Sequence, residues 1–187
     1  MKLYPNQLFH IYNRGNNRRK VFFERENYLF FLQKMREMLL PKKIEMLAYC
    51  LMPNHFHLMI STQDDFEHQD FSNAFRILLS SYTRAINKRY DWVGSVFQQN
   101  SKAKALENGI YAQTCFHYIH QNPMKADLVQ KIEDWEFSSY RDYAGLRNGT
   151  LCQQSTTRLL LDLPNDPENF INLSQKVIDP ELLEEIW

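Results

Sequence analysis

Two histidines stand one residue apart, at His55 and His57, with Phe56 between them. Residues 55–61 predict a strand, and side chains two apart on a strand point to the same face. Two imidazoles on one face supply two nitrogen ligands to a divalent metal and leave other coordination positions open. The pair also fits two surface histidines on an amphipathic strand, and the spacing alone leaves both interpretations open.

A phenol and a carboxamide stand four residues apart, at Tyr118 and Asn122. On a helix this spacing places both side chains on one face. There they would suit a nucleophile and a metal ligand. The other interpretation is a packed tyrosine and an asparagine that caps the helix before Pro123.

Basic and amide side chains are interleaved with tyrosine and phenylalanine, a pattern that suits phosphate contacts and base stacking. An ordinary solvated surface has the same composition, so the pattern is not decisive. The residues are Arg14, Arg18, Arg19, Lys20, Arg84, Lys88, Arg89, Gln98, Gln99, Lys102 and Lys104.

The composition excludes several classes of protein. Of the 187 residues, 44% are hydrophobic, enough for a sizeable core, and only five are glycine. Neither a P-loop nor a dinucleotide-binding glycine motif is present. The sequence contains no apolar run of the roughly 20 residues that a membrane span needs. Three cysteines without C-x-x-C spacing predict reduced thiols in a cytosolic protein.

The hydrophobic periodicity predicts an α+β fold of the ferredoxin-like kind, an antiparallel sheet flanked by helices. Pro41 ends the first helix, and Asn122-Pro123 is expected to end the third. The expected strands are 8–12, 44–52, 55–61, 95–99 and 102–106, and the expected helices are 24–40, 71–90, 110–120 and 135–143.

The charge is divided unevenly along the chain. Residues 1–150 carry a net charge of +5, and residues 151–187 carry −5. A basic body favours a polyanionic partner. We expect a catalytic domain over 1–146 and an acidic tail over 147–187, the latter ending in a short helix that begins at Asp179-Pro180. The tail either packs on the far side of the sheet or at a dimer seam, or docks on the active face and inhibits it.

Five sequence stretches occur in the order found in a known family, and together they cover about residues 10–145. They are Phe9-His-Ile-Tyr-Asn-Arg-Gly15, Leu51-Met-Pro-Asn-His-Phe-His-Leu-Met59, Gly94-Ser-Val-Phe-Gln98, Tyr118-Ile-His-Gln-Asn-Pro123 and Trp135-Glu-Phe-Ser-Ser-Tyr140. In this the chain resembles the IS200-like, single-tyrosine HUH transposases, in the branch of REP-associated tyrosine transposases.

The resemblance implies a DNA strand-transferase that cleaves and rejoins single-stranded DNA through a 5′-phosphotyrosine. It implies Tyr118 as the nucleophile, with His55 and His57 as ligands of Mg²⁺ or Mn²⁺. Asn122 matches the third ligand, with Gln121 as its nearest competitor. It also implies a homodimer acting on single-stranded or hairpin DNA in the cytoplasm, at the nucleoid, without a membrane.

Two other functions remain open at this point. One is a non-catalytic nucleic-acid-binding protein that retains the fold. The other is an unrelated metal-dependent phosphodiesterase that uses water as its nucleophile. Covalent trapping on labelled DNA separates both from a strand-transferase, because only a strand-transferase forms a protein–DNA adduct.

Overall fold

The computed structural model describes residues 2–106 and 109–178. Short 3-10 turns occur at Asn16–Arg18, Leu40–Lys42 and Ile132–Asp134. The strands are β1 (Leu8–Arg14), β2 (Ile44–Met52), β3 (His55–Thr62) and β4 (Lys102–Leu106). The helices are α1 (Arg25–Met38), α2 (His68–Tyr90), α3 (Ile110–Lys125), α4 (Tyr140–Tyr143), α5 (Gln154–Leu160) and α6 (Pro167–Ser174).

The strands form one antiparallel sheet in the order β2-β3-β1-β4. This order and the β-α-β-β-α-β-α succession confirm the predicted α+β, ferredoxin-like fold. The hairpin of β2 and β3 turns at Pro53-Asn54, as the sequence predicts. In the centre of the sheet β1 pairs with β3, and Arg14 lies opposite His55.

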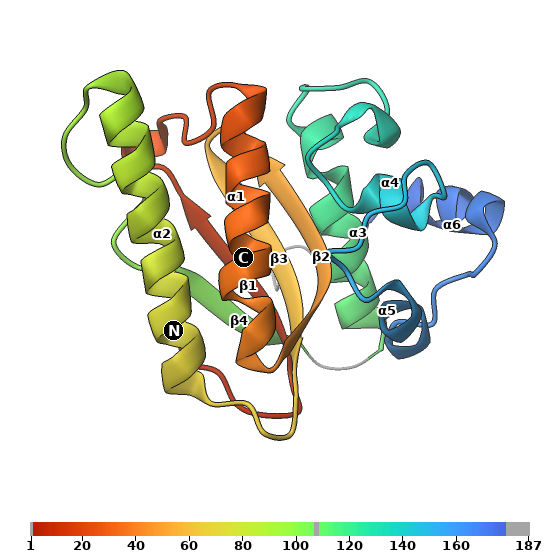
Figure 1. The fold of residues 1–187 in the computed structure, drawn as a ribbon. Coiled ribbons are helices and arrows are strands. Elements are labelled where there is room, and N and C mark those ends of the chain that lie inside the picture. Colours follow the sequence, from red (N-terminus) through yellow and green to blue (C-terminus); the bar gives the residue numbers. More distant parts are fainter. Residues whose placement is uncertain (1, 107–108, 179–187) are drawn as a thin grey trace.

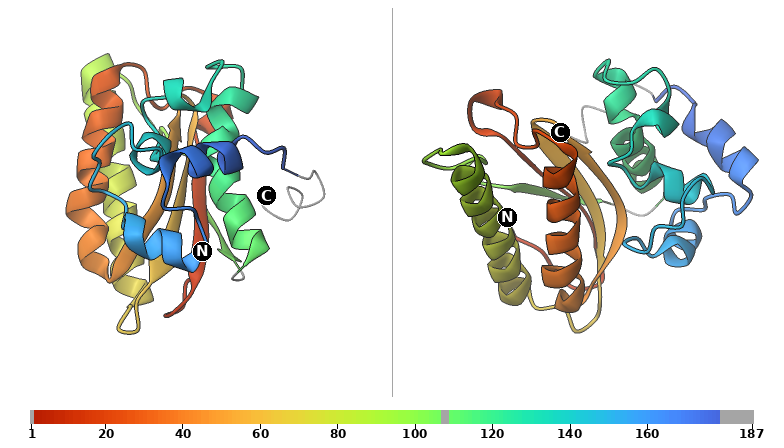
Figure 2. Two further views of the ribbon diagram at one scale, coloured as in Figure 1. Left: turned by 90° about the vertical axis from the view of Figure 1, so that its right-hand side faces the viewer. Right: turned by 45° about the horizontal axis from the view of Figure 1, so that its top comes forward.

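The molecule has three layers (Figure 1). Helices α1 and α2 cover one face of the sheet, and α3 lies on the other face with α4, α5 and α6 outside it (Figure 2). Along β3 the side chains alternate, so that Phe56 packs toward α1 and α2, against Phe31 and Phe75. The histidines on either side of Phe56 therefore point toward α3.

Helix α1 begins with a capping box in which the side chains of Glu24 and Asn27 bond reciprocally to backbone N–H groups. It buries Tyr28, Phe31 and Met35, which are spaced three to four residues apart. The helix ends at Met38, and Pro41 follows in a 3-10 turn. The expected helix over 24–40 is therefore confirmed to within two residues at the C-terminal end.

Residues 95–99 do not form the expected strand; Phe97 makes an isolated bridge with Gly15. The turn after β1 contacts this segment through Asn16 N–H to Val96 O and Gln98 N–H to Arg14 O, at 3.0 and 2.8 Å. The backbone at Gly94 has φ +90°, which bends the chain out of an extended path. Only Phe97 within the segment is buried, so the segment lacks the alternating buried face of a strand.

Helix α3 does not stop before Asn122-Pro123 as predicted; it continues to Lys125 with Pro123 inside it. Pro123 removes one backbone donor from the last turn. The Asn122 side chain donates Nδ2–H to Tyr118 O, one turn earlier, at 3.0 Å, and Ala126 N–H bonds to Asn122 O at 2.9 Å. Asn122 therefore stays on the helix, one turn after Tyr118.

The predicted helix over 135–143 is wrong for residues 135–139, which turn at Glu136-Phe137 and meet β2 through an isolated bridge between Ser138 and Cys50. Phe137 O accepts from Leu51 N–H, and Ser139 N–H donates to Tyr49 O. Phe137 stacks on Tyr28 at 3.8 Å between ring centroids, and Trp135 meets the same ring edge-on. Residues 135–139 thereby cover the edge of the sheet at β2.

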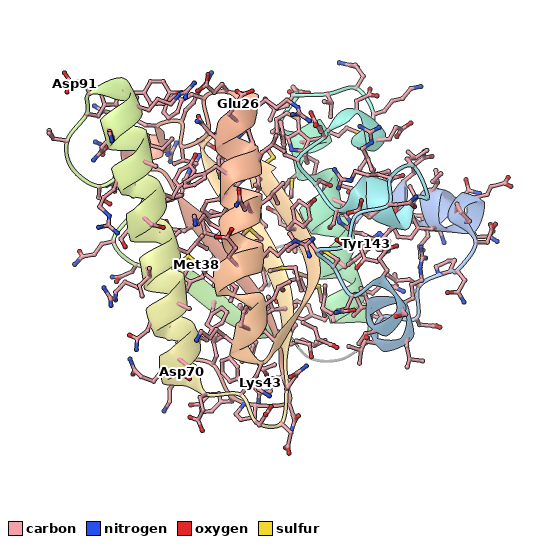
Figure 3. All side chains as sticks on the ribbon, in the orientation of Figure 1. Glu26, Met38, Lys43, Asp70, Asp91 and Tyr143 are labelled. Atoms are coloured by element: carbon pink, nitrogen blue, oxygen red, sulfur yellow. The ribbon has the colours of Figure 1, made fainter. Side chains whose placement is uncertain are left out.

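The segment after residue 146 packs against the rest of the domain through two helices, with α6 against α3 and α5 against β2. Phe170 of α6 is fully buried and contacts the rings of Phe116, Tyr140 and Tyr143. Tyr143 lies on the side of the sheet away from α1 and α2 (Figure 3). The terminal helix expected from Asp179 lies outside the described residues.

Replacing Phe170 with alanine is expected to lower the free energy of unfolding by about 3–5 kcal/mol, the usual cost of emptying a buried phenylalanine site. Urea unfolding measures the change. The matched control is Leu159→Ala, in the same segment but with the side chain 85% exposed. A Phe170→Ala loss no greater than that of the control would show that the segment does not stabilise the domain.

Candidate active site

The paired histidines of β3 share the face of the sheet that α3 covers. The ring centroids of His55 and His57 are 4.9 Å apart, with the rings perpendicular. The alternation that the sequence predicts for this strand places both imidazoles on one side, as expected. The other residues of the candidate site lie around these two imidazoles, on the side that faces α3.

His57 is completely buried and rests on a histidine that sequence analysis did not select. Its Nδ1 is 2.8 Å from Nε2 of His10 on β1, and the two rings stack with centroids 5.1 Å apart. Burial lowers the pKa of His57 well below its usual value, and His10 lowers it further. The available signal was the alternation of His10, Tyr12 and Arg14, which places all three on the face that carries His57.

His55 lies at the start of β3 and is partly exposed. Its Nδ1 is 2.6 Å from Oδ1 of Asn54. Burial and the facing Arg14 guanidinium lower the pKa of His55 to about 4. Both imidazoles are therefore neutral near pH 7, which is the state that binds a metal.

Helix α3 brings Tyr118 onto the histidine face. Its ring centroid lies 5.8 Å from that of His57, with the rings perpendicular. Tyr118 is 4% exposed, and Nζ of Lys125, two turns further along the helix, lies 5.5 Å from its ring centroid. Asn122 is also buried and shares the face, because four residues separate it from Tyr118.

The structure places two further polar residues of α3 away from the histidines: Gln121, the alternative third ligand, and Tyr111, the nearest other tyrosine of the helix. Gln121 faces the C-terminal segment, where its Nε2–H groups donate to Ser174 O and Lys176 O, both at 2.9 Å. Tyr111 lies about 10 Å along the helix axis from Tyr118, since each residue adds about 1.5 Å. Nζ of Lys104 lies 5.6 Å from the Tyr111 ring centroid.

A cleft of about 480 Å³ opens beside the histidines. It joins residues from four elements (β1, β3, β4 and α3) and a loop, and it brings together five of the residues that the sequence singled out. Its lining comprises Tyr12, Asn13, Arg14, His55, Gln98, Asn100, Lys102 and Asn122. Asn13 holds the loop in place through Nδ2–H bonds to Gln98 O at 3.1 Å and Ser101 Oγ at 2.7 Å.

The other predicted DNA contacts are spread over the surface. Arg84 lies in a groove between α2 and the loop 94–101, and Gln98 belongs to both this groove and the cleft. Arg19 and Lys20 border a hollow beside Trp92, and the neighbouring Arg18 is exposed. Lys88 lies apart, in a hollow between α1 and α2.

The donor atoms at the site fit a divalent cation. With Nδ1–H of His55 donated to Asn54, its Nε2 lone pair faces outward as a ligand. A His57 Nδ1–H bonded to His10 likewise fixes the tautomer that coordinates through Nε2. Asn122 donates its Nδ2–H to the backbone and keeps its carbonyl oxygen as an acceptor. Within 2–106 and 109–178, no three His, Cys, Asp or Glu side chains cluster as a metal site, so the candidate ligand set depends on the amide of Asn122 beside the two histidines.

Comparison with known proteins shows which family the chain belongs to. A family described as "Transposase IS200 like" matches residues 4–122, more than half of the chain and all of the site. This chain belongs to the IS200-like transposase family. The resemblance that the sequence motifs indicate is thereby confirmed.

Two curated relatives are REP-associated tyrosine transposases. The putative one from Haemophilus influenzae is 28% identical over 112 residues, which are 51% of this chain and 58% of the relative. The one from Escherichia coli is 26% identical over 104 residues, 55% of this chain and 59% of the relative. The matches thus span less than two thirds of the length of either relative.

A solved structure shows the same fold in the family. It is described as the REP-associated tyrosine transposase bound to a REP hairpin, and it matches with a TM-score of 0.62 at 17% identity. The match covers 82% of this chain and 98% of the other. In the described part of the chain, no helix has the length and apolar character needed to cross a membrane.

Proposed function

We propose that this IS200-like family member is a metal-dependent DNA strand-transferase that cleaves and rejoins single-stranded DNA through a 5′-phosphotyrosine on Tyr118. The observation that carries the proposal is the contact between Tyr118 and His57, ring to ring at 5.8 Å, beside a cleft lined by His55 and Asn122. A nucleophile and three potential metal ligands thus meet at one polar cleft.

The residues that would hold the metal are His55, His57 and Asn122. A bound Mg²⁺ or Mn²⁺ supplies Lewis-acid polarisation of the scissile phosphate. Two imidazoles do not by themselves select Mg²⁺, so the identity of the ion rests on the family. His10 and Asn54 hold the two imidazoles in the required orientation through Nδ1.

Tyr118 carries the covalent step. Its phenol loses a proton, and the phenolate oxygen attacks phosphorus. The Tyr118 oxygen–phosphorus bond forms while the bond from phosphorus to the 3′-oxygen breaks, and the 3′-oxygen leaves as a hydroxyl after taking up a proton. The Lys125 ammonium, 5.5 Å from the ring centroid, stabilises the phenolate. The new phosphodiester retains the energy of the old one, so the 3′-hydroxyl of a strand can reverse the reaction.

The proposed substrate is single-stranded or hairpin DNA. Arg14, Gln98 and Lys102 line the cleft, where they are placed to contact the phosphates next to the cleaved bond. The solved relative is described as bound to a REP hairpin, which supports a hairpin as one form of the substrate. We propose a homodimer acting at the nucleoid in the cytoplasm, on the same family basis.

Covalent trapping tests this function. The protein is incubated with 3′-labelled single-stranded DNA and Mn²⁺, and the products are separated under denaturing conditions. A strand-transferase gives a labelled protein–DNA adduct that EDTA abolishes. Binding without an adduct would favour the non-catalytic alternative, and cleavage without an adduct would favour a water-using phosphodiesterase.

Replacing Arg18, Arg19 and Lys20 together with alanine is expected to flatten the salt dependence of DNA binding by up to about 2–3 units of slope, if all three contact phosphates. Each phosphate contact releases roughly one counterion, so the slope counts the contacts directly. Fluorescence anisotropy at several salt concentrations measures it. Lys131→Ala, an exposed cation outside the cleft and grooves, is the control, and an unchanged slope in the triple variant would remove this turn from the interface.

A further inference from the structure

An exposed tryptophan stands at the end of α2, outside the candidate active site. Trp92 is 47% exposed, although aromatic neighbours hold its ring in place. Phe23 meets it edge-on with centroids 5.1 Å apart, and Tyr90 contacts it at 5.6 Å. Tyr90 is itself fixed by its hydroxyl, which donates to Glu24 Oε1 at 2.9 Å. A rigid and solvent-facing indole is a surface on which a flat ring can stack.

The hollow beside Trp92 is polar and cationic on its other side. It encloses about 330 Å³, and both Arg19 and Lys20 border it. Within 2–106 and 109–178, no carboxylate forms an ion pair with either residue. These charges are therefore available to a phosphate, and they border the same hollow as Trp92, so that a strand in the hollow meets both cations and an aromatic platform.

The walls of the hollow are fixed by side-chain amides. Asn16 Nδ2–H donates to Ser95 O at 2.9 Å, and Asn87 Nδ2–H donates to Gly94 O at 2.8 Å. These bonds tie the turn after β1 and the end of α2 to the loop that starts at Gly94. The hollow is thus preformed, which reduces the entropy lost when a ligand binds.

One carboxylate, Asp91, borders the same hollow. It lies at the end of α2, at the same end of the molecule as the start of α1 at Glu26 (Figure 3). An ionised carboxylate accepts hydrogen bonds but repels phosphate, so it suits the N–H groups on a base edge. Guanine, adenine and cytosine carry an amino group for this contact, and an unpaired thymine or uracil offers its N3–H.

The hollow is continuous with the candidate active site. Asn87 and Ser95 line both the hollow and the groove that carries Arg84. Gln98 and Asn100 line both that groove and the cleft with His55. A strand whose scissile phosphate lies in the cleft can therefore follow the groove to Trp92.

We propose that Trp92 and Asp91, with Arg19 and Lys20, form a nucleobase-binding subsite for the single strand that flanks the cleavage site. One unpaired base stacks on the Trp92 indole and donates its N–H to Asp91, while the adjoining phosphates bind the two cations. The inference rests on the proposed function, because it takes single-stranded DNA as the ligand.

Binding of a fluorescein-labelled, mixed-sequence single strand to the full chain tests the subsite. Trp92→Ala weakens binding by roughly 5- to 100-fold, as expected for the loss of one stacked base, and Trp92→Phe restores most of it. The salt slope stays unchanged, since stacking releases no counterions. The control is Tyr4→Ala. Tyr4 is an aromatic residue with the same exposed fraction as Trp92, 47%, and Nζ of Lys2 lies 5.2 Å from its ring centroid. It lies beyond the other end of β1.

Photocrosslinking gives a second readout. The analogue 5-iododeoxyuridine is placed at each position of the strand in turn. At one position, away from the nucleotide that links to Tyr118, the crosslinked peptide is expected to contain Trp92. If the wild-type chain binds DNA and Trp92→Ala binds as tightly as Tyr4→Ala, the subsite is overturned while the proposed function stands. If the wild-type chain binds no single-stranded DNA, both are overturned.

Discussion

Tyr118→Phe is expected to abolish covalent attachment and strand transfer, lowering the cleavage rate by at least about 10⁴-fold. The change removes one oxygen and leaves the ring against His57. DNA affinity should stay within a factor of about two, because the change removes a single oxygen from a side chain that is only 4% exposed. Adduct formation on labelled single-stranded DNA and anisotropy binding measure the two quantities.

Tyr111→Phe is the matched control for this experiment. It removes the same atom from a tyrosine of the same helix, two turns before Tyr118. The control is expected to cleave at the wild-type rate. A Tyr118→Phe protein that still forms the adduct, together with a Tyr111→Phe protein that does not, would move the nucleophile to Tyr111.

Metal binding should be lost when the paired histidines are replaced. His55→Ala and His57→Ala are each expected to weaken Mn²⁺ binding by more than the roughly 10–100-fold cost of removing a group that only supports a ligand. His10→Ala removes such a supporting group and should fall within that range. Asn122→Ala should do less harm than either histidine variant, since water can replace one amide oxygen. Calorimetric titration with Mn²⁺ ranks the variants.

His117→Ala provides the control, because that histidine is buried on α3 beside Phe170 of the C-terminal segment. It should retain wild-type Mn²⁺ affinity wherever the variant folds, as judged by circular dichroism. Wild-type affinity in a folded His55→Ala/His57→Ala double variant would refute the metal assignment. The same result in His10→Ala alone would remove only its supporting role.

The sequence predicted the elements that rest on strong periodicity. The pattern predicted strands over 44–52 and 55–61, joined at Pro53-Asn54, because each segment carries apolar side chains over the length of a strand. The position of α3 over His57 could not be read in the same way. It depends on where the helix crosses the sheet, which is a tertiary property that local pattern does not determine.

His10 shows why part of the site was missed. The alternation of His10, Tyr12 and Arg14 places His10 on one face of its strand but assigns it no role, and its contact with His57 appears only once β1 pairs with β3 in the centre of the sheet. The loop over 95–99 was misassigned for a related reason. Its apolar content serves to bury Phe97 against Phe31 and Tyr82, which requires a single anchor rather than a strand.

The C-terminal segment also contains helices that its sequence pattern does not predict. Helices α5 and α6 are too short for periodicity to reveal them, with seven and eight residues. Phe170 and the Gln121 bonds to Ser174 and Lys176 hold α6 against α3, whereas α5 lies beside β2, where the Gln153 N–H donates to Met46 O. An inhibitory role for the residues beyond 178 stays a prediction.

Mapping the covalent adduct tests the central claim most directly. The wild-type chain is trapped on single-stranded DNA with Mn²⁺, the DNA is digested to the linked nucleotide, and the modified peptide is sequenced by mass spectrometry. The proposed function predicts one 5′-phosphodeoxynucleotide on the Tyr118 phenol oxygen, absent when EDTA is present. Cleaved DNA with no modified peptide, or a nucleotide attached to any other residue, would contradict it.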